Sequence, residues 1–182
     1  MPSSKCQTPS HMSPATTAAI LGVALIACVT DIKARRIPNV LTLGAAATAL
    51  VYHTVLGGVD GFQAASLGWL AGAAAFMPFF LLGGMGAGDV KLLAALGAWM
   101  GPAGAMWVAL YASLAGGAIA IVVALGSGYL RAALANVRGL ITFWVLVGPR
   151  PMPGMTLERG TGPRLAYAVP IFVGTVVTLW LR

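Results

Sequence analysis

Residues 90–125, "VKLLAALGAWMGPAGAMWVALYASLAGGAIAIVVAL", form a long apolar run in which Lys91 is the only charged residue. A membrane-spanning helix needs about 20 apolar residues, so this run is too long for one crossing. The sequence GPAG at 101–104 is the natural place to divide it, because proline and glycine interrupt helices. We therefore expect a short helix before the break and a second helix over about 105–126.

The composition of the whole chain agrees with a membrane protein. Hydrophobic residues make up 59% of the 182 positions and charged residues only 8%, whereas a soluble domain of this size exposes far more charge. The length suits a single domain. Four more apolar runs are long enough to be spans, at 15–32, 39–56, 62–82 and 165–181. The sequence predicts an all-α, polytopic membrane protein with about six transmembrane helices.

The remaining segments are expected to lie outside the bilayer core. Residues 1–14 are polar and predict a disordered tail, which leaves 15–182 as the membrane domain. Residues 127–164 form a connector rich in arginine, proline and glycine. Within it, the apolar segment 139–148 is too short to cross a membrane, and cations flank it on both sides. Such a segment is expected to lie on one leaflet or dip into it, in contact with lipid.

The basic residues predict the orientation of the chain. The net charge is +7, from eleven Lys and Arg against four acidic residues. With six spans and the N-terminus outside, nine of the eleven cations fall in or beside the cytoplasmic segments 31–39, 83–90 and 127–164. Because basic residues favour cytoplasmic loops, we expect the N-terminus outside. No interleaving of basic and aromatic residues indicates nucleic-acid binding.

The cysteines do not indicate a disulfide framework or a metal site. Cys6 lies in the polar tail and Cys28 inside an apolar run, and they form no CxxC or CxxH pair. We therefore expect neither a metal nor another cofactor.

Two of the four acidic residues stand at unusual places. Asp60 lies in the GGVDG turn and Glu158 beside Arg159 in the connector, where a solvated acid is ordinary. Asp31 ends the first apolar run at the predicted cytoplasmic face, and Asp89 begins the run quoted above at the same face. Folding could therefore bring these two carboxyl groups together.

A close pair of carboxyl groups has a specific chemistry. Both cannot ionise cheaply, so at neutral pH the pair can share one proton. The ionised partner can accept a proton from a water molecule that attacks a peptide carbonyl, and the protonated partner can donate to the leaving amine. Such hydrolysis needs neither a metal nor a covalent intermediate.

Each aspartate also has a purely structural interpretation. Asp89 could be a helix N-cap, and Asp31 could pair with nearby cations. The neighbouring Gly86 and Gly88 could allow an extended substrate strand to approach the backbone, but a tight turn uses glycine equally well.

The segments around both aspartates resemble a known family. DIKARRIPNVLTL at 31–43 and GAGDVKLLAALGAWMG at 86–101 are similar to the two signature segments of type IV prepilin peptidases, the GxGD aspartyl proteases of the inner membrane. RLAYAVPIFVG at 164–174 resembles the last helix of that family, although Ala166 stands where a proline is common.

The resemblance implies a function and roles for individual residues. Asp31 and Asp89 match the two catalytic aspartates, Gly86 and Gly88 the glycines of the motif, and Lys91 its frequent basic residue. The implied substrates are prepilin or pseudopilin precursors, which lose a short basic leader at the cytoplasmic face. The chain lacks the four-cysteine domain of the larger bifunctional members, so we expect no N-methyltransferase activity. Its small size resembles the form that serves tight-adherence (Flp) pili.

Two alternatives remain open. An archaeal-type preflagellin peptidase uses the same motifs and is also an aspartyl protease. A non-catalytic membrane assembly or transport protein could instead use the two aspartates as coupling groups. The sequence does not indicate an oligomeric state, the identity of the precursor, or which aspartate is the general base.

Overall fold

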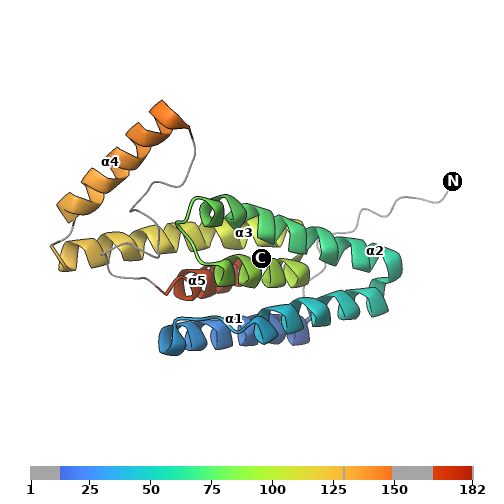
Figure 1. Ribbon diagram of the computed structural model, residues 1–182. Coiled ribbons are helices and arrows are strands. Elements are labelled where there is room, and N and C mark those ends of the chain that lie inside the picture. Colours follow the sequence, from blue (N-terminus) through green and yellow to red (C-terminus); the bar gives the residue numbers. More distant parts are fainter. Residues whose placement is uncertain (1–12, 129, 149–165, 182) are drawn as a thin grey trace.

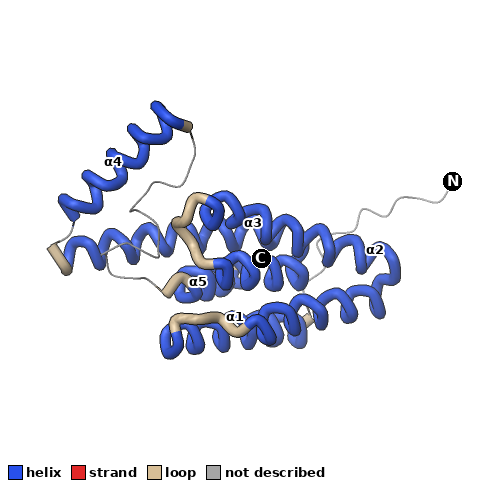
Figure 2. The backbone as a smooth tube through the Cα atoms, in the orientation of Figure 1, coloured by secondary structure: helices blue, strands red, loops and turns tan. Residues whose placement is uncertain are grey.

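The computed structural model describes residues 13–128, 130–148 and 166–181, and every regular element in these ranges is an α-helix. The backbone tube in Figure 2 shows helices joined by short loops. Three of the helices are long and apolar enough to cross a membrane: α1 (Pro14–Ala34), α2 (Asn39–Leu81) and α3 (Ala87–Gly126). The expected all-α, multi-pass architecture is confirmed, while the number of crossings and the outward N-terminus stay predictions.

α1 begins with a well-formed cap. The Ser13 hydroxyl oxygen accepts a hydrogen bond from the Thr16 backbone N–H at 3.2 Å, and Pro14 occupies the first helical turn. Both features favour a helix start, because the cap satisfies an otherwise unpaired N–H and proline has none to lose. Pro14, which was expected in the tail, therefore begins α1 and Ser13 caps it, while residues 1–12 lie outside the described ranges.

α2 and α3 are each divided by a glycine. Gly58 (φ 59°) interrupts α2, and Gly101 (φ 73°), followed by Pro102, interrupts α3. These positive φ angles strain residues with a side chain but suit glycine. The breaks fall in the GGVDG and GPAG sequences where turns were predicted. Each long helix therefore consists of two limbs, as Figure 1 shows for α2, which reverses direction at its far end.

Glycines allow α2 and α3 to pack backbone against backbone. A Cβ atom on Gly68 would collide with the Gly97 carbonyl oxygen, and one on Gly97 would collide with the Gly68 carbonyl oxygen. A Cβ atom on Gly72 would similarly collide with the Leu93 carbonyl oxygen. In a membrane, where lipid provides no hydrophobic drive for helix association, such close approach is a principal source of packing energy. The four-residue glycine spacing at 68–72 thus marks a real helix contact.

The first limb of α3 is the centre of the fold. Every residue from 92 to 100 is buried, enclosed by α1, α2 and α5 (Ala168–Trp180). α5 packs against the second limb of α3 through Gly174, whose added Cβ would lie 2.6 Å from the Ala112 nitrogen. Figure 1 shows α5 lying beside α3 and α1, although α5 is the last helix in the chain.

α4 (Leu130–Val147) stands apart from this bundle. It contacts α3 and no other described helix, and Figure 1 shows it pointing away from the other four. The predicted interfacial segment 139–148 forms its second half. The arginines Arg131 and Arg138, seven residues apart on α4, are both exposed, as are the apolar Leu134 and Val137. The rest of the connector, 149–165, lies outside the described residues, and the interfacial role stays a prediction.

Candidate active site

Asp31 lies in the last turn of α1 and contacts the start of α5. Its side chain is only 9% exposed, and its Oδ2 accepts a hydrogen bond from the Ala168 backbone N–H at 3.2 Å. Ala168 is the first residue of α5, where N–H groups have no partner within the helix. Asp31 therefore caps α5 from another helix, and the partial positive charge of that helix terminus favours a carboxylate there.

Asp89 is the third residue of α3 and is also 9% exposed. The N-cap of α3 is Gly86, so the structural interpretation of Asp89 as the N-cap is wrong. The Asp89 carboxylate instead reaches back to the Gly86 backbone N–H. This is the second half of a capping box, in which a side chain at the third helical position satisfies the N-cap amide. Gly86 has no side chain to supply the first half.

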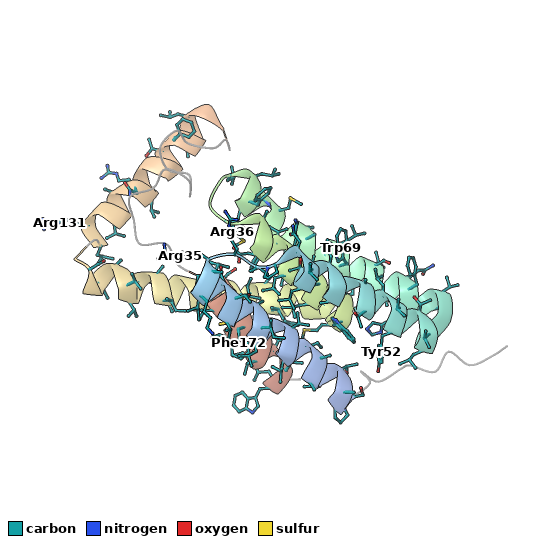
Figure 3. All side chains as sticks on the ribbon, turned by 60° about the horizontal axis from the view of Figure 1, so that its bottom comes forward. Arg35, Arg36, Tyr52, Trp69, Arg131 and Phe172 are labelled. Atoms are coloured by element: carbon teal, nitrogen blue, oxygen red, sulfur yellow. The ribbon has the colours of Figure 1, made fainter. Side chains whose placement is uncertain are left out.

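The structure brings the two aspartates to the same place. α1 packs against α3, and the Asp31 and Asp89 carboxyl groups interact electrostatically across that contact. Figure 3 shows Arg35 and Arg36, which follow α1, near the end of the bundle where α4 begins at Arg131, whereas Tyr52 lies toward the opposite end. Ionising both carboxyl groups in such a poorly solvated site is costly, which favours a state in which one of them keeps its proton.

The motif glycines have a packing role around this pair. A Cβ atom on Gly88 would lie 3.3 Å from the Ile37 Cβ, and one on Gly86 would lie 3.1 Å from Asp89 Oδ2. Both distances are tighter than ordinary contacts, so a side chain at either position would displace Ile37 or the carboxyl group. Gly86 and Gly88 are each partly exposed. The packing role is therefore established by geometry, and the approach of a substrate strand stays a prediction.

Lys91 joins the two signature segments. Its Nζ donates a hydrogen bond to Asn39 Oδ1 at 3.0 Å, linking the first turns of α3 and α2. Lys91 is exposed, so this bond competes with water. The arrangement indicates a surface link rather than a direct contact with the aspartate pair.

The Lys91–Asn39 hydrogen bond predicts a small, measurable coupling. In a double-mutant cycle of Lys91→Met and Asn39→Ala, we expect a coupling energy of about 0.5 kcal/mol in thermal unfolding in detergent, because exposed polar pairs contribute little. A coupling energy of several kcal/mol would contradict the assignment of this bond to the surface.

Sequence reasoning missed the segment that completes the site. Tyr167 and Ala168, at the start of α5, lie 136 and 137 positions after Asp31, yet Ala168 supplies the hydrogen bond to Asp31. The donor is a backbone amide, which leaves no trace in the choice of side chain. The resemblance of 164–174 to a family segment was the only signal that this turn matters.

Two further titratable side chains, those of His53 and Cys28, are not part of the aspartate pair. The His53 Nε2–H donates to the Trp99 carbonyl oxygen at 3.3 Å, near the break in α3 where that carbonyl loses its helical partner. Cys28 is buried one turn before Asp31. Among the described residues, no cluster of three or more His, Cys, Asp or Glu side chains could hold a metal ion.

Comparison with known proteins identifies the family. A model of the type IV leader peptidase family matches residues 18–121, which is more than half of the chain and includes both aspartates, both motif glycines and Lys91. The match ends before α4 and α5. No curated protein and no solved structure matches the chain. A buried pair of aspartates at one end of a multi-pass helical bundle suits the chemistry of a peptidase, and the chain belongs to the type IV leader peptidase family.

Proposed function

We propose that this protein is an intramembrane aspartyl endopeptidase that removes the basic leader from type IV pilin-like precursors at the cytoplasmic face of the inner membrane. Family membership supports peptidase activity. The observation that carries the assignment to Asp31 and Asp89 is their burial together at the contact of α1 with α3. The Flp-type subclass of substrate is part of this proposal.

The reaction follows from one proton shared by two carboxyl groups. The ionised aspartate accepts a proton from a water molecule as the water oxygen bonds to the scissile carbonyl carbon. The protonated aspartate donates its proton as the C–N bond breaks and the amine leaves. The products are the leader, with a new carboxyl end, and the mature pilin, with a new amino end. The rate should fall at both low and high pH, since only the singly protonated pair is competent.

The position of the site suits a substrate that is itself embedded in the membrane. Arg35 and Arg36 directly follow the last turn of α1, which holds Asp31, and Figure 3 shows Arg131 toward the same end of the bundle. Cations favour the cytoplasmic side, which is also where a basic leader stays when the following apolar helix inserts. The scissile bond between leader and helix would then lie at the depth of Asp31 and Asp89.

This orientation predicts which residues an impermeant reagent can label. Asp60 is exposed at the break in α2, and Gly84 is exposed in the loop before α3. In a Cys6→Ser background, we expect Asp60→Cys to react with a membrane-impermeant maleimide on intact cells. Gly84→Cys should react only after the membrane is opened, because that loop is expected in the cytoplasm. The reverse pattern would show that the chain is inserted the other way up.

The proposed activity is tested by co-expression with a pilin-like precursor. We expect the precursor to lose the mass of its leader, with no methyl group added to its new N-terminus. A preflagellin precursor tested in parallel distinguishes the archaeal-type alternative. If neither precursor is shortened while the protein is correctly inserted, the chain is a non-catalytic assembly or transport protein and the proposal fails.

A further inference from the structure

The Tyr167 ring occupies a closely fitted position beside the aspartate pair. It makes an edge-on contact with the Phe76 ring of α2, with centroids 5.8 Å apart. On another side it lies against the bare backbone of Gly116 in α3, where an added Cβ would be 3.1 Å from Tyr167 Cε2 and 3.2 Å from its hydroxyl oxygen. Tyr167 thus contacts both long helices and immediately precedes α5.

The position of this ring affects Asp31 through the backbone. Tyr167 is the N-cap of α5, and the next residue, Ala168, donates its N–H to Asp31 Oδ2. Because Tyr167 and Ala168 are consecutive, a shift of the ring moves the amide that orients the Asp31 carboxyl. The ring therefore fixes one half of the aspartate pair.

The Tyr167 hydroxyl provides a second attachment to α3. It interacts with the Ser113 hydroxyl on the second limb of α3 and with the charge of Asp89 on the first limb. The Ser113 hydroxyl donates its own hydrogen to the Ala109 carbonyl oxygen at 2.8 Å, so its oxygen is free to accept from the phenol. Among the described residues, the ionisable groups that interact with Asp89 from neighbouring elements are Asp31 of α1 and Tyr167 itself.

We propose that Tyr167 is a positioning residue for the aspartate pair, its ring and its hydroxyl together fixing the start of α5 and so the amide that orients the Asp31 carboxyl. The inference rests on the proposed function for its kinetic effects but makes a separate statement about the carboxyl group. Tyr167 lies outside the segment that matches the family model, so the match assigns it no role.

The hydroxyl is tested with Tyr167→Phe, which keeps the ring. We expect kcat for leader cleavage to fall roughly tenfold with KM nearly unchanged, because the ring loses the hydrogen bond to Ser113 that helps to hold it in place. Ser113→Ala should have a smaller effect in the same direction. Thermal unfolding in detergent should stay close to wild type, which separates this role from a loss of fold.

The role of the Tyr167 ring is tested by replacing each of two neighbouring glycines with alanine. Gly116→Ala places a methyl group against the ring and should lower kcat about tenfold, as misplacing a catalytic group does. Gly117→Ala, whose Cβ meets nothing within 4 Å, should behave as wild type. If both glycine variants act alike, the seating of the ring does not govern the site.

A spectroscopic measurement separates this inference from the peptidase assignment. Infrared difference spectra between acidic and alkaline samples should contain the C=O stretch of the protonated carboxyl, assigned by its loss in Asp89→Asn. We expect this band to shift in Tyr167→Phe and to stay fixed in Gly117→Ala. An unchanged band in Tyr167→Phe would overturn the role of the hydroxyl, whether or not any precursor is cleaved. A shifted band without cleavage by the wild type would instead reject only the proposed function.

Discussion

Replacing either Asp31 or Asp89 with asparagine is expected to lower the rate of leader cleavage by roughly a thousandfold or more. Each variant removes the group that accepts or donates the shared proton, and general acid–base catalysis contributes about 10²- to 10⁴-fold. Asparagine keeps the shape of the side chain, and its carbonyl oxygen can still accept from the Ala168 N–H. Precursor and product are measured by mass spectrometry in membranes that hold equal amounts of inserted protein.

Asp60→Asn is the matched control for these variants. It makes the same chemical change at an exposed acid in the break of α2, and it should cleave the precursor at the wild-type rate. Full activity in either Asp31→Asn or Asp89→Asn would mean that the pair is not the catalytic dyad. In the single-proton mechanism the two groups act as one unit. The double variant Asp31→Asn, Asp89→Asn should therefore cleave the precursor no more slowly than the less active of the two single variants.

The second large effect is expected at the close contact of α2 with α3. Gly68→Ala should lower the free energy of unfolding by about 3 kcal/mol, because its methyl group would meet the Gly97 carbonyl oxygen and neither backbone can yield cheaply. Gly44→Ala is the control within the same helix, since its Cβ meets nothing within 4 Å. That variant should be neutral or slightly stabilising, as alanine favours helix over glycine.

Thermal unfolding in detergent or lipid nanodiscs measures both glycine variants. Equal stabilities for Gly68→Ala and Gly44→Ala would show that α2 and α3 do not approach as closely as described. Loss of leader cleavage in Gly68→Ala at temperatures where the protein is still folded would indicate that this packing also positions Asp89, because Gly97 lies on the same limb of α3.

Much of the fold could be predicted because glycine and proline have specific backbone consequences. The breaks at Gly58 and Gly101 were predictable from GGVDG and GPAG, since φ angles near these values are open to glycine. The positions of the long helices were predictable from the apolar runs.

Other features were hidden for identifiable reasons. The N-terminal half of α4 was not predicted because Arg131 and Arg138 interrupt the apolar run, although Leu134 and Val137 continue the helical spacing. The N-cap of α3 at Gly86 could not be predicted because a glycine cap leaves no side-chain signature, whereas an aspartate such as Asp89 is a common cap.

The candidate site was predictable only in part. Asp31 and Asp89 could be expected at one membrane depth from the order of apolar runs, and the motifs singled them out. The contribution of α5 could not be predicted, because it depends on a backbone N–H and on a ring seated against a bare glycine. Such contacts arise from tertiary packing and leave no pattern in the local sequence.

The central claim is that Asp31 and Asp89 meet at one end of the bundle. In a Cys6→Ser, Cys28→Ala background, the pair Asp31→Cys and Asp89→Cys should be joined by a short bifunctional thiol reagent. The pair Asp31→Cys and Asp60→Cys should not be joined, because Asp60 lies at the far break of α2. Linkage of 31 to 89 alone is the expected result. Linkage of 31 to 60, or none between 31 and 89, would contradict the account.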